Sequence, residues 1–301
     1  MKLDLNKIRE FQNIEMLAKQ LVEGFITGLH KSPYHGFSVE FAEHKLYNAG
    51  ESTRHIDWKV YAKSDRLYTK RYEEETNLRC HIIIDTSSSM YYPQETNGKI
   101  TFSIMSAASI AYLLHKQRDA VGLFTFSDQI EIETQVKSTP SHLHKIFLDL
   151  QNLLQQKPEL QKTAVSETLH EIARKIHKRS LVIIFSDMLE NQSQSDQIFS
   201  ALQHLKHNKH EVLLFHVNDT RTELDFDFED KPHEFIDIES GQKIKLQPFQ
   251  IKETYRKTVK EYFHTLKLKT SQLKIDFIEA DINQSFDKVL SAYLIKRAKM
   301  K

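Results

Sequence analysis

An aspartate, a threonine and three serines follow directly on a run of isoleucines in the segment IIIDTSSSM, residues 82–90. If the isoleucines form a buried strand, the turn after it can bring the hydroxyls of Ser87 and Ser89 back toward the carboxylate of Asp85. Three oxygen donors would then face one point. Oxygen donors suit hard cations such as Mg²⁺, Mn²⁺ or Ca²⁺, whereas zinc favours imidazole and thiolate. The spacing therefore indicates a site for a hard divalent cation.

Two further positions with oxygen donors are expected at the same edge of the sheet. A second aliphatic run, 180–187, ends in Ser186 and Asp187, and Thr163 stands in the loop before a helix predicted from 166. In open α/β sheets, ligands bind beyond the carboxyl ends of the strands, where successive connections go to opposite faces. Because octahedral Mg²⁺ needs six oxygens, several loops and water must contribute. The expected metal-site residues are Asp85, Ser87, Ser89, Thr163 and Asp187.

The elements that must position these residues alternate along the chain from residue 80 onward. Short runs rich in Val, Ile, Leu and Phe predict strands that are covered on both faces; they span 81–85, 120–126, 180–187, 211–217 and 274–280. The intervening segments predict helices at 101–116, 141–156, 166–178, 194–208, 251–270 and 284–296. This alternation predicts an α/β fold with a doubly wound, mostly parallel sheet and right-handed crossovers.

Two segments break the alternation, and the N-terminal part differs in kind. Residues 128–136 alternate apolar and polar side chains, which predicts a short edge strand antiparallel to its predecessor. Residues 233–247 predict a hairpin with a Ser-Gly turn. An apolar stripe over 7–29 predicts an amphipathic helix. We expect a small α+β module at 1–79 and an α/β domain at 80–301.

The composition favours some classes of function over others. The chain has 42 basic and 41 acidic residues among 301, a formal net charge of +1. It therefore lacks the excess of positive charge that is typical of proteins that bind nucleic acid non-specifically. Its single cysteine, Cys80, cannot form an internal disulfide, which suits a reducing compartment. No stretch approaches the roughly 18 uninterrupted apolar residues of a membrane span. We therefore expect a cytoplasmic protein without membrane insertion.

The order DTSSS, then a threonine in KTAVSETL, then the acid that closes VIIFSD resembles the metal ion-dependent adhesion site of von Willebrand factor type A domains. The resemblance implies that Ser87, Ser89 and Thr163 are direct ligands, with Asp85 and Asp187 acting mostly through bound water. An ion with few charged ligands stays electron-poor. Such a site would take a carboxylate from a protein partner to complete the metal shell.

The segment GFSVEFAEHKLYNAGESTRHIDWKVYAKSDRLYTKRYEEE, residues 36–75, resembles the signature of the bacterial domain of unknown function 58 family, which precedes a type A domain. The resemblance implies a binding module rather than an enzyme. It also implies the partners: a MoxR-type AAA+ ATPase and other type A domain proteins, for which members of the family act as adaptors in the assembly or maturation of protein complexes.

Other interpretations of the same residues remain open. Asp and Ser after a strand are also typical of a helix N-cap, which needs no metal. An aspartate in this place could instead be the nucleophile of a metal-dependent phosphoryl-transfer hydrolase, with Asp85 attacking phosphate. Such hydrolases carry a second acid two residues later, where this chain has Ser87. The chain also lacks a G-x-S-x-G elbow and a G-x-x-x-x-G-K-[ST] loop.

Overall fold

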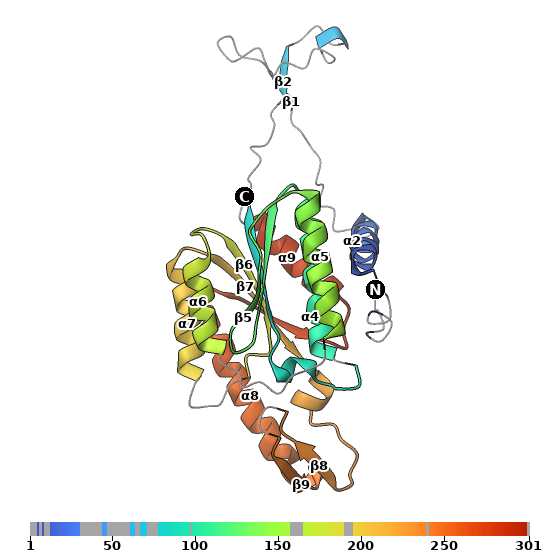
Figure 1. Ribbon diagram of the computed structural model, residues 1–301, viewed down its shortest axis with the longest axis vertical. Coiled ribbons are helices and arrows are strands. Elements are labelled where there is room, and N and C mark those ends of the chain that lie inside the picture. The colour runs from blue at the N-terminus through green and yellow to red at the C-terminus, as the bar shows by residue number, and fades with distance from the viewer. Residues whose placement is uncertain are drawn as a thin grey trace. The chain divides into compact units, whose positions relative to one another are not determined.

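A computed structural model of the 301-residue chain gives the fold (Figure 1). The structure describes residues 5, 8, 13–30, 44–46, 61–63, 67–70, 78–96, 98–156, 165–189, 195–238 and 241–299. The chain forms two compact units, one of residues 1–25 with 78–301 and one of residues 26–77. The N-terminal residues thus group with the α/β unit, whereas the sequence interpretation placed them with the module that ends at 79.

The larger unit contains a six-stranded sheet in the order β10-β7-β6-β3-β4-β5. Its strands are β3 (Arg79–Asp85), β4 (Ala120–Phe126), β5 (Ile130–Glu133), β6 (Leu181–Ser186), β7 (Glu211–Asn218) and β10 (Asp276–Asp281). All pair in parallel except β5, which runs antiparallel to β4 at the edge. Counted along the chain, the order is 3-2-1-4-5-6, that of doubly wound folds. The predicted α/β class and the antiparallel edge strand are both confirmed.

Helices cover both faces of this sheet (Figure 1). One face carries α4 (Gly98–Lys116), α5 (Pro140–Gln155) and α9 (Asp287–Lys299). The other face carries α6 (Val165–Lys175), α7 (Ser195–His207) and α8 (Pro248–Gln272). All six helices predicted after residue 80 are present, with ends shifted by a few residues. Connections to alternate faces create the crevice at which α/β folds bind ligands.

The core lies on both sides of the central strands because successive strand residues point to opposite faces. Ile83, Ile184 and Leu214 are fully buried beneath α6 and α7. Phe185 and Phe215 point to the other face, where their rings stack with centroids 4.8 Å apart. Helix α4 covers that face and is buried almost throughout, so its apolar and small side chains are not confined to one stripe as in an amphipathic helix.

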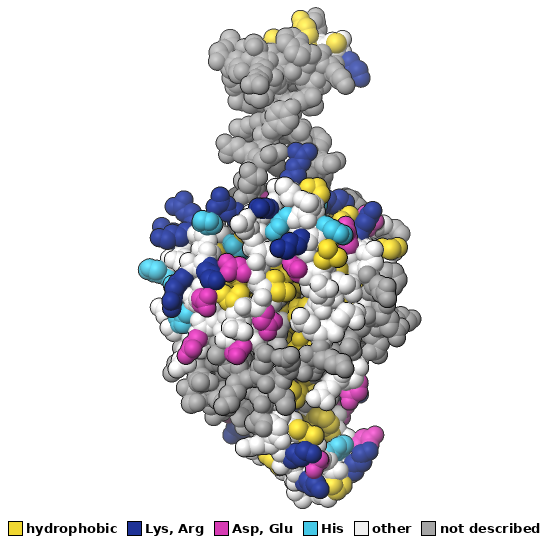
Figure 2. Space-filling view, viewed as in Figure 1, with side chains coloured by type: hydrophobic (Ala, Val, Ile, Leu, Met, Phe, Trp, Pro, Cys, Tyr) yellow, Lys and Arg dark blue, Asp and Glu magenta, His cyan; other side chains and the backbone are white. Residues whose placement is uncertain are grey.

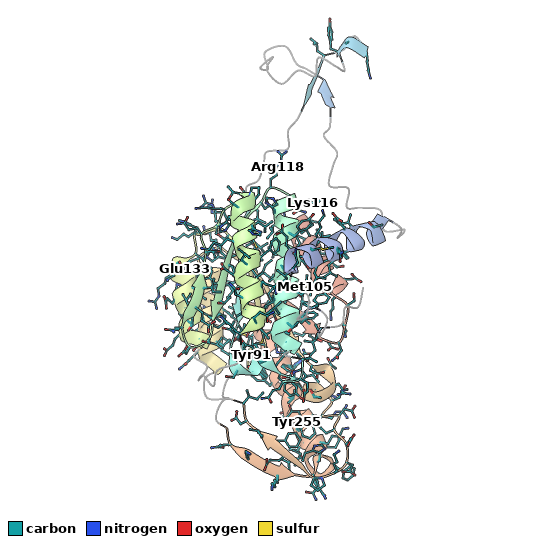
Figure 3. The ribbon with its side chains drawn as sticks, turned by 45° about the vertical axis from the view of Figure 1, so that its right-hand side comes forward. Tyr91, Met105, Lys116, Arg118, Glu133 and Tyr255 are labelled. Carbon is teal, nitrogen blue, oxygen red and sulfur yellow. The ribbon has the colours of Figure 1, made fainter. Side chains whose placement is uncertain are left out.

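The N-terminal helix α2 (Ile14–His30) confirms the helix predicted at 7–29. Its apolar stripe buries Ile14, Leu17 and Leu21. The backbone N–H of Ile14 donates to Oε1 of Gln151 in α5 at 3.1 Å, and Figure 3 shows the helix beside α4 and α5. The first part of α2 therefore packs against the larger unit through its apolar face.

An inserted segment follows β7. It begins with η4 (Thr220–Leu224), a π-helical turn, and continues into the hairpin of β8 (His233–Ile236) and β9 (Lys243–Leu246). The predicted hairpin is confirmed, with Gly241 at a φ of +70° after the turn, a conformation that costs little only for glycine. The hairpin extends from the edge of the sheet at which the parallel strands end (Figure 1).

The smaller unit, residues 26–77, contains a two-stranded antiparallel ladder. Strand β1 (His44–Leu46) pairs with β2 (Tyr68–Lys70), with Lys45 opposite Thr69. Most of the signature segment 36–75 lies outside the described residues.

Candidate metal site at the carboxyl edge of the sheet

Strands β3 and β6 lie side by side at the centre of the sheet, with Ile84 opposite Phe185. The chain leaves β3 toward α4 on one face and leaves β6 toward α7 on the other. This is the switch point at which open α/β sheets form a crevice. The strand ends bring Asp85 next to Ser186, so residues about a hundred positions apart form one polar cluster.

The carboxylate of Asp85 is fully buried and held from two sides. The backbone N–H of Ser87 donates to Oδ1 at 2.9 Å, and the hydroxyl of Ser186 donates to Oδ2 at 2.6 Å. The oxygen of Ser186 itself accepts the N–H of Met188 at 2.9 Å. These contacts orient Asp85 without supplying a cation.

The two serines predicted as metal ligands lie together in the turn after β3. Ser87 Oγ is 3.1 Å from Ser89 Oγ. Ser87 precedes the 3₁₀ turn η2 (Ser88–Tyr91) as its N-cap residue, yet its side chain makes no capping hydrogen bond. Capping alone therefore does not account for the hydroxyl of Ser87, which faces its serine neighbour instead.

Asp187 joins the same cluster from the end of β6. Its Oδ1 accepts the backbone N–H of Leu189 at 3.2 Å, and the side chain of Ser89 also hydrogen-bonds to it. Its Oδ2 accepts the ammonium of Lys99 at 2.8 Å. Burial raises the pKa of Asp187, but the charge and hydrogen bond of Lys99 outweigh burial and leave the pKa below its usual value.

Lys99, at the start of α4, is a member of the site that the sequence interpretation missed. Its side chain is 0% exposed, and Nζ donates to Oε1 of Glu223 in η4 at 2.6 Å as well as to Asp187. Oε2 of Glu223 accepts the N–H of Asp219 at 2.7 Å. Burial lowers the pKa of Lys99, but the two carboxylates raise it above its usual range. Lys99 is the one charged residue in the segment 98–114, and this isolation could have marked it as a member of the site. No comparable sequence pattern marks Glu223.

The charges of the cluster do not balance. The cluster contains three carboxylates, those of Asp85, Asp187 and Glu223, but only Asp187 and Glu223 pair with the ammonium of Lys99, which leaves an excess of two negative charges when all are ionised. Burial and the nearby charge of Asp187 raise the pKa of Asp85 to about 7. A buried carboxylate with this shift lacks a compensating cation.

The donors described here fit a hard divalent cation. They are hydroxyl and carboxylate oxygens, the set that Mg²⁺ and Mn²⁺ prefer, and the carboxylates of the cluster outnumber its ammonium. No trio of His, Cys, Asp or Glu side chains arranged to hold a metal occurs within the described part of the chain, so binding at this site would depend on the serine hydroxyls. The structure brings together Asp85, Ser87, Ser89 and Asp187, while Thr163 lies outside the described residues.

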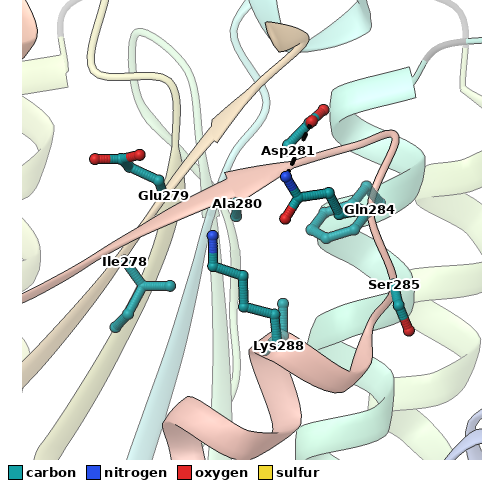
Figure 4. A pocket seen from close by; sticks show the side chains of 9 residues that line it. Ile278, Glu279, Ala280, Asp281, Gln284, Ser285 and Lys288 are labelled. Atoms are coloured by element: carbon teal, nitrogen blue, oxygen red, sulfur yellow. Dashed lines mark hydrogen bonds between the residues drawn. The ribbon is translucent and has the colours of Figure 1, made fainter.

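Other surface features of the larger unit are less specific. A shallow hollow lies between the edge strand β10 and α9, lined in part by Glu279, Asp281 and Lys288 (Figure 4). Charged side chains of both signs are interspersed over the face seen in Figure 2. Among the described residues, no helix combines the length and apolar character needed to cross a membrane.

Relatives of this chain occur among mycobacterial proteins. Uncharacterized proteins of Mycobacterium bovis and Mycobacterium tuberculosis are 22% identical to it over 212 residues, which is 70% of this chain and 64% of each relative. The chain thus spans less than two thirds of the length of the curated relatives it matches.

Solved structures with a similar arrangement are more distant in sequence. The conserved hypothetical protein BatB from Bacteroides thetaiotaomicron is 14% identical, with a TM-score of 0.42 over 74% of this chain and 100% of that one. The pilus adhesin SpaC from Lactobacillus rhamnosus GG is 13% identical, with a TM-score of 0.45 over 74% and 30% of the two chains. The strand order and register, rather than these matches, assign the fold.

The sequence profile described as "Protein of unknown function DUF58" matches residues 43–265. The match covers both strands of the smaller unit, the whole serine turn after β3, Lys99 and Glu223. It confirms the family resemblance drawn from the signature segment. The chain therefore belongs to the DUF58 family.

Proposed function

We propose that this protein is a metal-dependent protein-binding module, in which the cluster at the carboxyl edge of the sheet holds Mg²⁺ or Mn²⁺ and recognises an acidic residue of a partner. The observation that carries the proposal is the meeting of Ser87 and Ser89, 3.1 Å apart, with the buried carboxylates of Asp85 and Asp187. Together they offer oxygen donors and an excess of negative charge at one switch point.

The hydroxyl and carboxylate side chains of the site would have different roles in binding the ion. Ser87 and Ser89 would hold the ion directly, with Thr163 as a third hydroxyl, while Asp85 and Asp187 supply negative charge and act mostly through water. The bound ion would supply an electrophilic point that attracts a carboxylate. Hydrogen bonds from Ser186 and the N–H of Ser87 keep Asp85 in place, so the site needs little rearrangement when the ion binds.

The partner class follows from the family resemblance. We propose a MoxR-type AAA+ ATPase, together with other type A domain proteins, and an adaptor role in the assembly or maturation of protein complexes. The protein would act in the cytoplasm. An acidic side chain of the partner would complete the metal shell, as expected where most direct ligands are neutral hydroxyls.

A binding role suits the geometry better than phosphoryl transfer by Asp85. A nucleophile must approach its substrate, yet Asp85 is 0% exposed, and each of its oxygens already accepts a hydrogen bond. We therefore propose that the protein is not an enzyme. A phosphatase screen of the protein with Asp85→Asn as control tests this, because activity lost in the variant would restore the hydrolase alternative.

The central experiment measures binding of the full chain to a MoxR-type ATPase by biolayer interferometry, in Mg²⁺ and in chelator. We expect binding in Mg²⁺, at least about tenfold weaker binding in chelator, and a similar loss in Ser87→Ala. Ser109→Ala is the matched control, because Ser109 is equally buried but donates to Met105 O within α4. A partner affinity that is unchanged both in chelator and in Ser87→Ala would refute metal-bridged recognition.

A further inference from the structure

Lys99 is a fully buried charge of the candidate site, and its ammonium is shared between two carboxylates. Its ammonium lies 2.8 Å from Asp187 Oδ2 and 2.6 Å from Glu223 Oε1, and its side chain is 0% exposed. Burying an ammonium is costly unless it is fully paired. The two carboxylates come from the end of β6 and from η4, so Lys99 joins three separate segments at the rim of the site.

This contact occupies the very carboxylate that the metal-site prediction assigns to the ion. Asp187 Oδ2 accepts Lys99, and Oδ1 accepts the N–H of Leu189. An ion that approached Asp187 would have to share its oxygens with the ammonium. A positive charge so close, in surroundings with little water to screen it, also repels a second cation.

We propose that Lys99 is a tethered cation that competes with the divalent ion for Asp187 and thereby sets how tightly the site holds that ion. This inference rests on the proposed function. It assigns Lys99 a role in specificity: the ammonium keeps Asp187 from becoming a strong direct ligand, so the hydroxyls of Ser87 and Ser89 dominate the site. The ion then remains dependent on a carboxylate from the partner.

Glu223 is the second carboxylate that pairs with Lys99. Its Oε1 accepts a hydrogen bond from Lys99, so that Asp187 and Glu223 share the ammonium, and its Oε2 accepts the N–H of Asp219 at 2.7 Å. Glu223 lies in η4, which leads into the hairpin of β8 and β9. The strength of the ion site is therefore linked to the position of the inserted segment 219–247.

The test measures Mn²⁺ binding to the full chain by isothermal titration calorimetry, with electron paramagnetic resonance of free Mn²⁺ as a second readout. We expect Lys99→Met to bind Mn²⁺ about tenfold more tightly than the unmodified protein, because a repelling charge is removed. We expect Glu223→Gln to bind severalfold more weakly, because negative charge is lost and Lys99 turns wholly to Asp187.

A matched control exists elsewhere in the same unit. Lys296 also bridges two carboxylates, those of Glu211 at 2.6 Å and Asp276 at 2.7 Å, at the opposite ends of β7 and β10 from the site. Lys296→Met removes a paired ammonium of the same kind, and we expect its Mn²⁺ affinity to be unchanged.

The outcomes separate this inference from the proposed function. Mn²⁺ binding that Ser87→Ala abolishes but Lys99→Met leaves unchanged or weakens would keep the metal site and overturn the competitor role. Absence of Mn²⁺ binding in the unmodified protein and in Lys99→Met would overturn both. Should Lys99→Met fail to fold, Lys99→Gln takes its place, because it also removes the charge but keeps a polar end: tighter Mn²⁺ binding supports the role of Lys99, and equal or weaker binding contradicts it.

Discussion

The hydroxyl of Ser186 donates to Oδ2 of Asp85 at 2.6 Å, although 101 residues separate the two in the chain. The contact exists because β6 pairs directly with β3 in the sheet, so that both strands end at the same point. It orients the carboxylate of Asp85 toward the serine turn. The site is thus a product of strand order, and an isolated DTSSS peptide would not form it.

A divalent ion that binds the folded protein and not the unfolded chain should raise the melting temperature. At free Mg²⁺ about 100 times the dissociation constant, the expected gain is about 2.7 kcal/mol, or about 5 °C for a unit of this size. Differential scanning calorimetry with Mg²⁺ and with chelator measures it. Ser87→Ala should abolish the shift and Ser109→Ala should retain it; equal shifts in all three proteins would place the ion elsewhere.

Acid should destabilise the protein through its buried histidines. His81 is 4% exposed, and neither ring nitrogen has a hydrogen-bond partner within the described residues. Burial is the main cause that lowers its pKa to about 4, against about 6.5 in an unfolded chain. Between these values the unfolded chain binds more protons, so stability falls as the pH drops from about 6.5 to about 4. His216 behaves in the same way, with a pKa lowered to about 4 mainly by burial.

Replacing His81 tests this dependence. Urea unfolding at pH 7.5 and pH 5 should show that His81→Phe reduces the loss of stability between the two values by up to about 2 kcal/mol. His264→Gln, at an exposed position on α8, serves as the control and should leave the loss unchanged. An identical loss in His81→Phe and the unmodified protein would mean that His81 is not neutral in the folded state.

The ion pair of Arg297 with Asp119 should be worth several kcal/mol at neutral pH. Arg297 Nη2 lies 3.0 Å from Asp119 Oδ2, and the carboxylate is 0% exposed. Removing one partner of a buried pair typically costs about 3–5 kcal/mol because the other charge remains uncompensated. We expect this cost for Arg297→Met in urea unfolding at pH 8, and most of it should return when Asp119→Asn is added.

The same variant should be less impaired in acid. Burial raises the pKa of Asp119 to about 6 even with Arg297 present, and loss of the guanidinium raises it further. As the pH falls through this value, Asp119 becomes protonated and no longer needs a cation, so the defect of Arg297→Met should shrink between pH 8 and pH 5. A constant defect over that range would show that Arg297 acts through packing.

Truncation in the core beneath α4 should cost more than truncation at the surface. Phe215 is fully buried and stacks on Phe185 with an interplanar angle of 9°. Phe215→Ala should lower the free energy of unfolding by about 3–5 kcal/mol. Leu268→Ala, at a side chain that is 50% exposed, should change it by no more than about 0.5 kcal/mol. Similar effects of the two variants would contradict the assignment of the core.

Several features could be read from local patterns. The aliphatic runs predicted the parallel strands because strands buried on both faces need apolar side chains at every position. Alternation at 128–136 predicted the antiparallel edge strand, and the Ser-Gly pair predicted the turn between β8 and β9. Asp85 and Asp187 were expected at one edge because both follow such runs, and the structure places Asp85, Ser87, Ser89 and Asp187 in one cluster.

The α/β class, the order of the elements, the family and most of the expected oxygen donors could therefore be predicted from the amino-acid sequence, because each depends on side-chain periodicity or on a contiguous motif. The three-dimensional fold was needed to show that β6 pairs with β3, that residues 14–25 of α2 group with the larger unit, and that Lys99 lies between Asp187 and Glu223. The two contacts of Lys99 join residues that are 88 and 124 positions apart in the chain. Local sequence patterns do not predict such long-range contacts, because the partners of a buried charge come together only in the folded chain.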